Sequence, residues 1–186
     1  MDNNHADLIE ESVSSEEIYN GKIVHLYKDK VRLPNGKFAT REVMRHTGAV
    51  AIVPLTEEGN VIVVRQYRYP FAEVLLEIPA GKLDVGEAPE DCARRELSEE
   101  TGCEAERLIP LGEYYPSVAV LDEKIHLYLA RGLVQKTVHP DEDEFLQVES
   151  MPLKTLVEMI MQGQIRDGKT QTALLKTWYL EQNRKE

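Results

Sequence analysis

The chain is poor in cysteine and has no long apolar run. Cys92 and Cys103 are its two cysteines, and they have neither a metal-ligand spacing nor a disulfide-rich pattern, which indicates a reduced, cytoplasmic compartment. The longest apolar run, residues 49–55, is far shorter than the roughly 20 residues that span a bilayer. The first twelve residues lack the basic and apolar regions of a secretory signal. These absences argue against a membrane protein and against a secreted protein.

Basic residues are also scarce, since 22 Lys and Arg stand against 33 Asp and Glu, a formal net charge of −11. This balance argues against binding to nucleic acid or to anionic lipid, both of which require clustered basic side chains. The excess is concentrated in two windows, residues 84–100 and residues 141–149, each with a net charge of −5. An acidic window is often only a solvated face, so the spacing within each window must distinguish such a face from a functional site.

The order of patterns along the chain predicts one α/β domain with a mixed sheet behind an N-terminal β segment. We expect a flexible tail over residues 1–12, the β segment over 13–47 and the main domain over 48–186. Pro89 and Gly102 fit the first turn and the stop of a helix over residues 89–101. The other expected elements are strands within 18–44 around a turn at 34–36, strands at 49–55, 61–67, 74–78, 108–114, 125–130 and 145–148, and helices at 153–162 and 170–182.

Residues 163–170 match the phosphate-binding pattern GxxxxGK[ST]. That loop requires a strand before it, whereas an amphipathic helix is predicted here and only 16 residues follow. We therefore interpret the segment as a turn between two helices, with Gly163 as the stop of the first helix and Thr170 as the N-cap of the second.

Glu96, Glu99 and Glu100 have the spacing i, i+3 and i+4, which places three carboxylates on one helix face. Each like-charged pair at this spacing costs about 0.2–0.5 kcal/mol, a cost that a divalent cation would offset. Mg²⁺ prefers hard carboxylate oxygens and keeps waters that a phosphate substrate can replace. On spacing alone, a metal site and a solvated helix face both remain open.

The residues around this helix extend the pattern. Gly81, Glu87, Arg95 and the run from Glu96 to Gly102 match Gx5Ex7REUxEExGU at every fixed position, and Cys103 fills the last apolar slot. We call residues 81–103 the box. The chain resembles the Nudix hydrolase family, and the segments PNGK, REVMRHTGAVAIVP, EIPAGK and DEDEF resemble its ADP-ribose pyrophosphatase-like branch. The resemblance covers residues 17–180 and implies an α/β/α sandwich with a mixed sheet and an N-terminal antiparallel β extension.

The resemblance also implies roles for individual residues. The metal ligands would be the carbonyl of Ala80 and the carboxylates of Glu96, Glu99, Glu100 and Glu144. Glu142 resembles the general base that activates water, although the choice between Glu142 and Glu144 stays open. Glu99 would assist Glu96 and Glu100, the main metal ligands, and is also expected among the catalytic residues. Gly81, Glu87, Arg95 and Gly102 would be structural residues of the motif, Arg95 orienting the carboxylates.

Substrate contacts are expected from residues outside the box. Arg41, Arg65 and Arg68 precede it on predicted strands and would hold a pyrophosphate by charge-assisted hydrogen bonds. Tyr19 would stack on adenine, with a packing role as the alternative. Pro116 belongs to a loop that faces the terminal ribose in relatives. Here Ser117 replaces the usual glycine of that loop, which leaves the choice of substrate open.

Together these features predict Mg²⁺-dependent hydrolysis of ADP-ribose to AMP and ribose 5-phosphate, with Mn²⁺ as a substitute cation. The expected assembly is a homodimer formed through the N-terminal segment, without nucleic acid or membrane partners. The alternative substrate is another nucleoside diphosphate derivative, a nucleotide sugar or a dinucleotide. A non-catalytic ADP-ribose-binding module is the alternative from another class, and the intact box argues against it.

Overall fold

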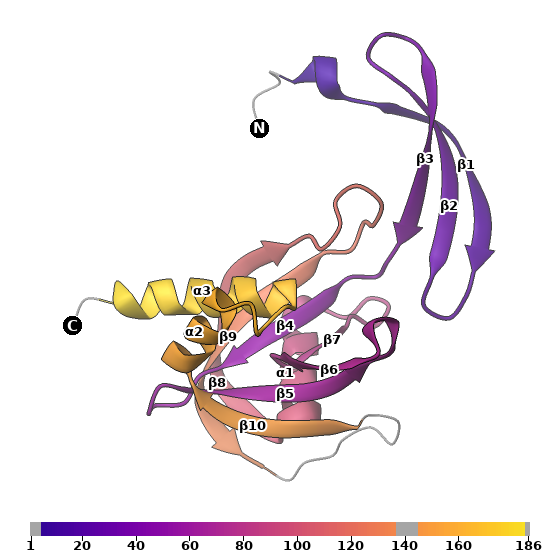
Figure 1. Ribbon diagram of the computed structural model, residues 1–186. Helices are drawn as coiled ribbons and strands as arrows, with labels where there is room; N and C mark the ends of the chain where they lie inside the picture. The colour runs from indigo at the N-terminus through magenta and orange to yellow at the C-terminus, as the bar shows by residue number, and fades with distance from the viewer. Residues whose placement is uncertain (1–4, 137–144, 185–186) are drawn as a thin grey trace. The chain divides into compact units, whose positions relative to one another are not determined.

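The computed structural model describes residues 5–136 and 145–184, which form two compact units. The first unit holds the described part of Met1–His46 together with Ser117–Glu123. After a short 3-10 helix, η1 (Ala6–Leu8), it contains an antiparallel sheet of β1 (Glu11–Asn20), β2 (His25–Arg32) and β3 (Phe38–Arg45), in that order (Figure 1). The predicted turn is present between β2 and β3, where Gly36 has a φ of +79°. β1 begins at Glu11, so its first two residues lie in the segment expected as a flexible tail.

A later segment of the chain completes the first unit. The N–H of Met44 donates to the carbonyl of Val120 over 2.7 Å, and the N–H of Asp122 donates to the carbonyl of Met44 over 3.1 Å. The N–H of His46 donates to the Asp122 carboxylate over 2.7 Å. No local pattern in the sequence indicates that residues 117–123 pair with the end of β3.

The second unit contains a four-stranded sheet and a three-stranded sheet. The first has the order β7 (Ala80–Lys82), β4 (Ala49–Pro54), β9 (Ile125–Gln135) and β8 (Cys103–Tyr114). β4 and β9 are parallel and the other pairs are antiparallel, so the sheet is mixed, as the sequence predicts. The other sheet is antiparallel, with the order β10 (Leu146–Pro152), β5 (Asn60–Arg68) and β6 (Glu73–Glu77); the 3-10 helix η2 (Tyr69–Phe71) joins its last two strands.

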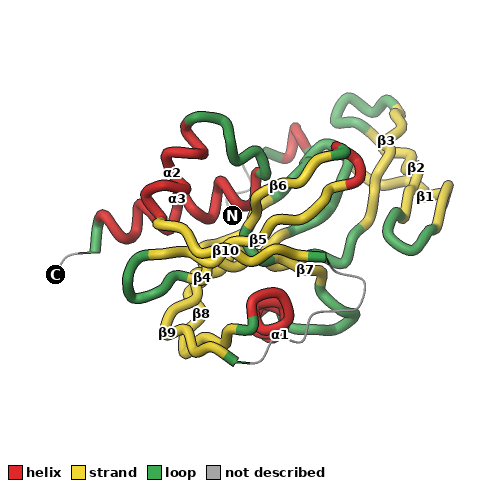
Figure 2. The backbone as a smooth tube through the Cα atoms, turned by 60° about the horizontal axis from the view of Figure 1, so that its bottom comes forward, coloured by secondary structure: helices red, strands yellow, loops and turns green. Residues whose placement is uncertain are grey.

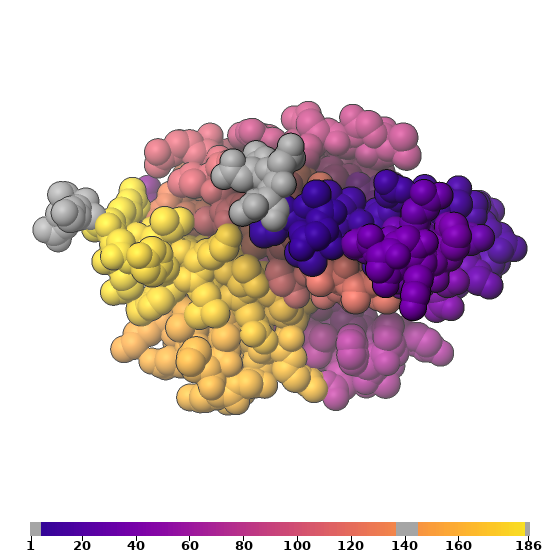
Figure 3. All heavy atoms as spheres, turned by 90° about the horizontal axis from the view of Figure 1, so that it is seen from above, coloured from indigo at the N-terminus to yellow at the C-terminus, as the bar shows by residue number. Residues whose placement is uncertain are grey.

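Helices cover both faces of these sheets in the second unit. Every residue of β4 is buried, because alternate side chains enter two different cores. Val50 and Ile52 pack with α1 (Pro89–Thr101), whereas Ala51 and Val53 pack in the core that holds α2 (Leu153–Met161) and α3 (Gly168–Gln182). Figure 2 shows α1 on one side and α2 and α3 on the other, and Figure 3 shows the outer surface of α2 and α3. The predicted α/β/α sandwich is confirmed.

Local sequence signals fix α1 well. Pro89 is its first residue and Gly102 ends it with a φ of +68°, as predicted. The three-residue strand β7 is not among the strands that the sequence predicts, since nothing in so short a segment reveals its pairing with β4. The N-cap predicted at Thr170 is wrong: Asp167 caps α3, accepting from the N–H of Thr170 over 2.9 Å. Among the described residues, no helix has the length and apolar character needed to cross a membrane.

Candidate active site in the box

Two carboxylates of the box lie on the buried side of α1. Glu96 is 8% exposed and Glu100 is 5% exposed, and they share this side of the helix with Cys92, Ala93 and Leu97. Burial of two acids one turn apart costs free energy unless other groups compensate their charges. The predicted helix face is therefore not a solvated face, because the fold holds these two carboxylates inside.

Arg95 is the cation that joins the acidic side chains of the box. Its Nη1 donates to Glu96 over 2.7 Å and to Glu99 over 3.0 Å, while its Nε and Nη2 donate to the two oxygens of Glu87, each over 3.0 Å. The hydrogen bonds from Arg95, with a further one from the N–H of Asp84, lower the pKa of Glu87 to about 2. Arg95 thus connects three carboxylates of the box.

Gly81 and Ala80 lie directly beside the two buried acids. A Cβ atom on Gly81 would come within 1.9 Å of the Glu96 carboxylate, so only glycine leaves room for this side chain. The N–H of Ala80 donates to Oε2 of Glu100 over 3.2 Å. β7 and α1 therefore bring a backbone segment close to two carboxylates that follow it by about 15–20 positions in the sequence.

A divalent cation fits the chemistry of this site. Glu87, Glu96, Glu99 and Glu100 carry four negative charges against the single positive charge of Arg95, and all their donor atoms are hard oxygens. Within the described ranges, no three His, Cys, Asp or Glu residues converge into a ready metal-binding geometry. Glu96 and Glu99 accept hydrogen bonds from Arg95, whereas Glu100 accepts one from the N–H of Ala80.

A second charged network lies next to the box and includes one predicted substrate residue, Arg68. Arg68 donates to both oxygens of Glu77 over 2.7 Å each, and Lys169 of α3 forms an ion pair with the same carboxylate. Burial raises the pKa of Glu77, but Arg68 and Lys169 outweigh burial and lower it to about 2. The sequence did not identify Glu77 or Lys169, although each stands in a motif, EIPAGK and GxxxxGKT respectively.

The other predicted substrate residues have local surroundings of their own. Arg65 on β5 pairs with Glu149 on β10, its Nε donating over 2.5 Å. Pro116 lies in the exposed connection after β8. In the first unit, Arg41 donates to Glu10 with its Nε over 2.9 Å, and the ring of Tyr19 lies beside Gly21 on an exposed stretch of β1. The predicted residues Glu142 and Glu144 lie outside the described residues.

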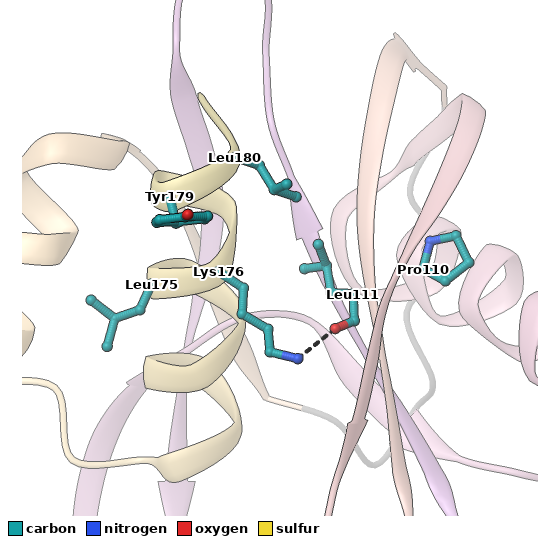
Figure 4. A pocket seen from close by; sticks show the side chains of 6 residues that line it. All are labelled: Pro110, Leu111, Leu175, Lys176, Tyr179 and Leu180. Atoms are coloured by element: carbon teal, nitrogen blue, oxygen red, sulfur yellow. Dashed lines mark hydrogen bonds between the residues drawn. The ribbon is translucent and has the colours of Figure 1, made fainter. Parts of the chain in front are cut away.

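A groove between β8 and α3 is lined mostly by apolar side chains, unlike the acidic box. Its volume is about 430 Å³, and its walls are formed by Pro110, Leu111, Leu175, Lys176, Tyr179 and Leu180 (Figure 4). The one charged side chain, Lys176, donates to the carbonyl of Leu111 over 2.6 Å. None of the box residues lines this groove, so we do not assign the chemistry to it.

Comparisons with known proteins show the family to which the chain is similar. Residues 44–172 match the model of the NUDIX domain, and residues 10–44 match that of the nucleoside diphosphate sugar hydrolase N-terminal domain. ADP-ribose pyrophosphatase of Bacillus subtilis (strain 168) is 41% identical over 169 residues, covering 90% of this chain and 91% of that protein. Methanol dehydrogenase activator of Bacillus methanolicus is 42% identical over 167 residues, covering 89% and 90%.

A solved structure has the same fold. The crystal structure of an ADP compounds hydrolase matches with a TM-score of 0.83, covering 95% of this chain and 97% of that chain. Its sequence identity is 24%, so the likeness concerns the fold. The α/β class predicted from the sequence is confirmed by this match as well.

Proposed function

Because this chain belongs to the NUDIX domain family, we propose that it hydrolyses the pyrophosphate bond of ADP-ribose to AMP and ribose 5-phosphate. The observation that carries the proposal is the box itself, in which buried Glu96 and Glu100 face the segment Ala80–Gly81. Relatives named ADP-ribose pyrophosphatase, similar over most of both chains, support the choice of substrate.

The cation is proposed to be Mg²⁺, with Mn²⁺ as a substitute. The carbonyl of Ala80 and the carboxylates of Glu96, Glu99 and Glu100 would hold it, with Glu144 as an additional ligand. When bound, the cation would neutralise the pyrophosphate and polarise the phosphorus under attack. Carboxylate and carbonyl oxygens are the ligands that this cation prefers, and the net charge of the box favours it.

The protein side chains supply the proton transfer and the orientation. Glu142 would take a proton from the attacking water, a bond would form from that oxygen to phosphorus, and the bridging P–O bond would break to release AMP and ribose 5-phosphate. Arg95 would orient Glu96 and Glu99 through the hydrogen bonds that it donates to them. Arg68 is linked to the segment that precedes the box through its pair with Glu77. Arg41, Arg65, Tyr19 and Pro116 complete the proposed substrate contacts.

Another nucleoside diphosphate derivative, a nucleotide sugar or a dinucleotide, is the second candidate substrate. The match of residues 10–44 to the N-terminal domain of nucleoside diphosphate sugar hydrolases favours it, and so does Ser117 in the loop expected to face the terminal ribose. A panel of ADP-ribose, nucleotide sugars and dinucleotides, scored by release of nucleoside monophosphate with Mg²⁺ and with EDTA, tests both candidates. ADP-ribose should give the highest kcat/KM, and binding without turnover would instead indicate a non-catalytic module.

Cation loading should also control substrate binding. The formal charge of the box repels a doubly phosphorylated ligand until cations neutralise it. Calorimetry with an Mg²⁺-loaded inactive variant, Glu142→Gln, should therefore give a much tighter ADP-ribose complex than the same variant in EDTA. Equal affinity in both conditions would contradict the proposed site.

A homodimer formed through the first unit is part of the proposal. Among the described residues of this unit, Val31 is the one buried hydrophobic residue. A three-stranded sheet gains stability by covering an apolar face, and a second copy would do so. Its exposed apolar side chains are Leu8, Ile9, Val13, Ile18, Tyr19, Ile23, Val24, Phe38, Val118 and Val120. Light scattering should show a dimer that Ile18→Glu dissociates and Ser14→Glu does not.

The proposed setting is the cytoplasm, with no nucleic acid partner. Both cysteines are buried and free, which suits a reducing compartment, and burial raises the pKa of Cys92 to about 12. The net charge of −11 supports the absence of nucleic acid binding. Filter binding to DNA and RNA at low salt should give no retention.

A further inference from the structure

The segment from Glu77 to Ala80 joins β6 to β7 and ends at the proposed ligand carbonyl of Ala80. It begins at a buried carboxylate, since the side chain of Glu77 is 2% exposed. Lys169, with a side chain only 11% exposed, forms an ion pair with Glu77 and another with Asp167 over 3.0 Å. A buried lysine costs free energy unless it is paired, so these partners hold Lys169 against the end of β6.

The next residue is fixed by a hydroxyl group. The N–H of Ile78 donates to Oγ1 of Thr170 over 3.1 Å, and both residues are fully buried. Ile78 lies in the connection between β6 and β7. Its buried backbone N–H needs an acceptor there, and the hydroxyl of Thr170 supplies it. Thr170 in turn is held by Asp167, which caps the first turn of α3.

The remainder of the segment contacts the sheet and the box. The carbonyl of Pro79 accepts from the N–H of Ile52 over 2.9 Å, and the N–H of Ala80 donates to Glu100 over 3.2 Å. Four successive residues are thus held by α3, by β4 and by α1. A shift at Ile78 would be transmitted over two covalently linked residues to the carbonyl of Ala80 and to the carboxylate of Glu100.

We propose that Lys169 and Thr170 are positioning residues for the divalent-cation site, because they fix the backbone that presents Ala80 beside Glu100. This inference rests on the proposed function of the box. It also accounts for the GKT part of the pattern at residues 163–170. There the lysine and the threonine bind a carboxylate and a backbone N–H of the same chain, and the loop follows α2 rather than a strand.

The test compares two buried threonines of α3. Thr170→Val keeps the shape of the side chain and removes the acceptor of the Ile78 N–H, whereas Thr170→Ser keeps the hydroxyl. Thr177→Val is the matched control, since Thr177 is also fully buried and its hydroxyl has no hydrogen-bond partner among the described residues. Lys169→Met removes the second contact without altering a buried hydroxyl.

Calorimetric titration with Mn²⁺ in the absence of substrate is the first measurement. Thr170→Val should weaken Mn²⁺ binding by about tenfold, the lower end of the range for groups that support metal ligands. Lys169→Met should shift it in the same direction, Thr170→Ser should restore most of the affinity, and Thr177→Val should match the wild type. At saturating metal, Thr170→Val should lower kcat more than it raises KM.

Wild-type Mn²⁺ affinity in both Thr170→Val and Lys169→Met would overturn the inference, even if their melting temperatures fell, because the contacts would then be structural only. The outcome is separable from the proposed function. If wild-type protein binds Mn²⁺ and Thr170→Val weakens it without any turnover of ADP-ribose, the positioning role stands and the proposed reaction fails. If the wild-type protein hydrolyses ADP-ribose but Thr170→Val and Lys169→Met bind Mn²⁺ as tightly as the wild type, the proposed reaction stands and the positioning role fails.

Discussion

Gly81 and Glu96 occupy adjoining space: a Cβ atom on Gly81 would lie 1.9 Å from the carboxylate carbon of Glu96. Gly81 has no positive φ, so alanine suits its backbone and the added methyl acts only on its neighbour. The fixed glycine of the box is therefore explained by the space that it leaves for an acid. Its conformational freedom is not needed.

The first prediction follows from this contact. Gly81→Ala should displace the Glu96 carboxylate, which is the mobile end of a side chain, and lower Mn²⁺ affinity and turnover by about tenfold or more. The melting temperature of the cation-free protein should change little. The control is Gly59→Ala, where nothing lies within 4 Å but φ is +83°. That variant should lose about 1–3 kcal/mol of stability and keep its activity. Wild-type turnover and Mn²⁺ affinity in Gly81→Ala would contradict the predicted effect of this contact.

The second prediction concerns Arg95. Arg95→Met should destabilise the cation-free protein by about 1–3 kcal/mol, since it leaves the buried carboxylate of Glu96 without its cationic donor. Added Mg²⁺ should then raise the melting temperature more in the variant than in the wild type. Scanning calorimetry with and without Mg²⁺ measures both effects.

The control for Arg95 is its neighbour on the same helix. Arg94 forms an exposed i,i+4 pair with Glu90, so Arg94→Met should change stability by no more than about 0.5 kcal/mol. Equal losses in the two variants would show that Arg95 has no special function in the box.

The third prediction is a pH dependence. The pKa of Glu77 is about 2 in the folded chain against an ordinary 4.5, so the unfolded state binds the proton more readily. The stabilising contribution of Glu77 is thus complete above pH 4.5 and disappears as the pH falls toward 2; its upper limit is about 3 kcal/mol. Urea unfolding should show a difference between wild type and Glu77→Gln that shrinks between pH 6 and pH 3.

The matched control is Glu73→Gln on the same strand. Glu73 forms an exposed pair with Arg166, which contributes little, so this variant should follow the wild type at every pH. A difference for Glu77→Gln that stays constant with pH would contradict the buried network.

These contacts differ in how far the sequence reveals them. The bounds of α1 and the spacing of Glu96, Glu99 and Glu100 depend on local signals, and the sequence predicts them. The contact of Thr170 with Ile78 joins residues 92 positions apart, and only the packing of α3 against the sheet creates it. A periodic pattern describes a face, whereas a contact between two elements requires their relative placement.

Arg68 illustrates the same limit. The sequence proposes it as a phosphate contact, which is reasonable for a basic residue before the box. The structure adds that a buried acid, Glu77, already accepts hydrogen bonds from Nε and Nη2 of its guanidinium group. Since Glu77 belongs to the segment that leads to Ala80, the network connects the proposed phosphate contact to the proposed cation site.

The central claim is that the carboxylates of the box hold the cation needed for hydrolysis. The most direct measurement is AMP release from ADP-ribose as a function of Mg²⁺ for Glu100→Gln, with Glu90→Gln, an exposed substitution on the same helix, as the control. We predict that Glu100→Gln loses at least about two orders of magnitude in kcat and requires more Mg²⁺, while Glu90→Gln matches the wild type. Near-wild-type turnover by Glu100→Gln would contradict the assignment of this site.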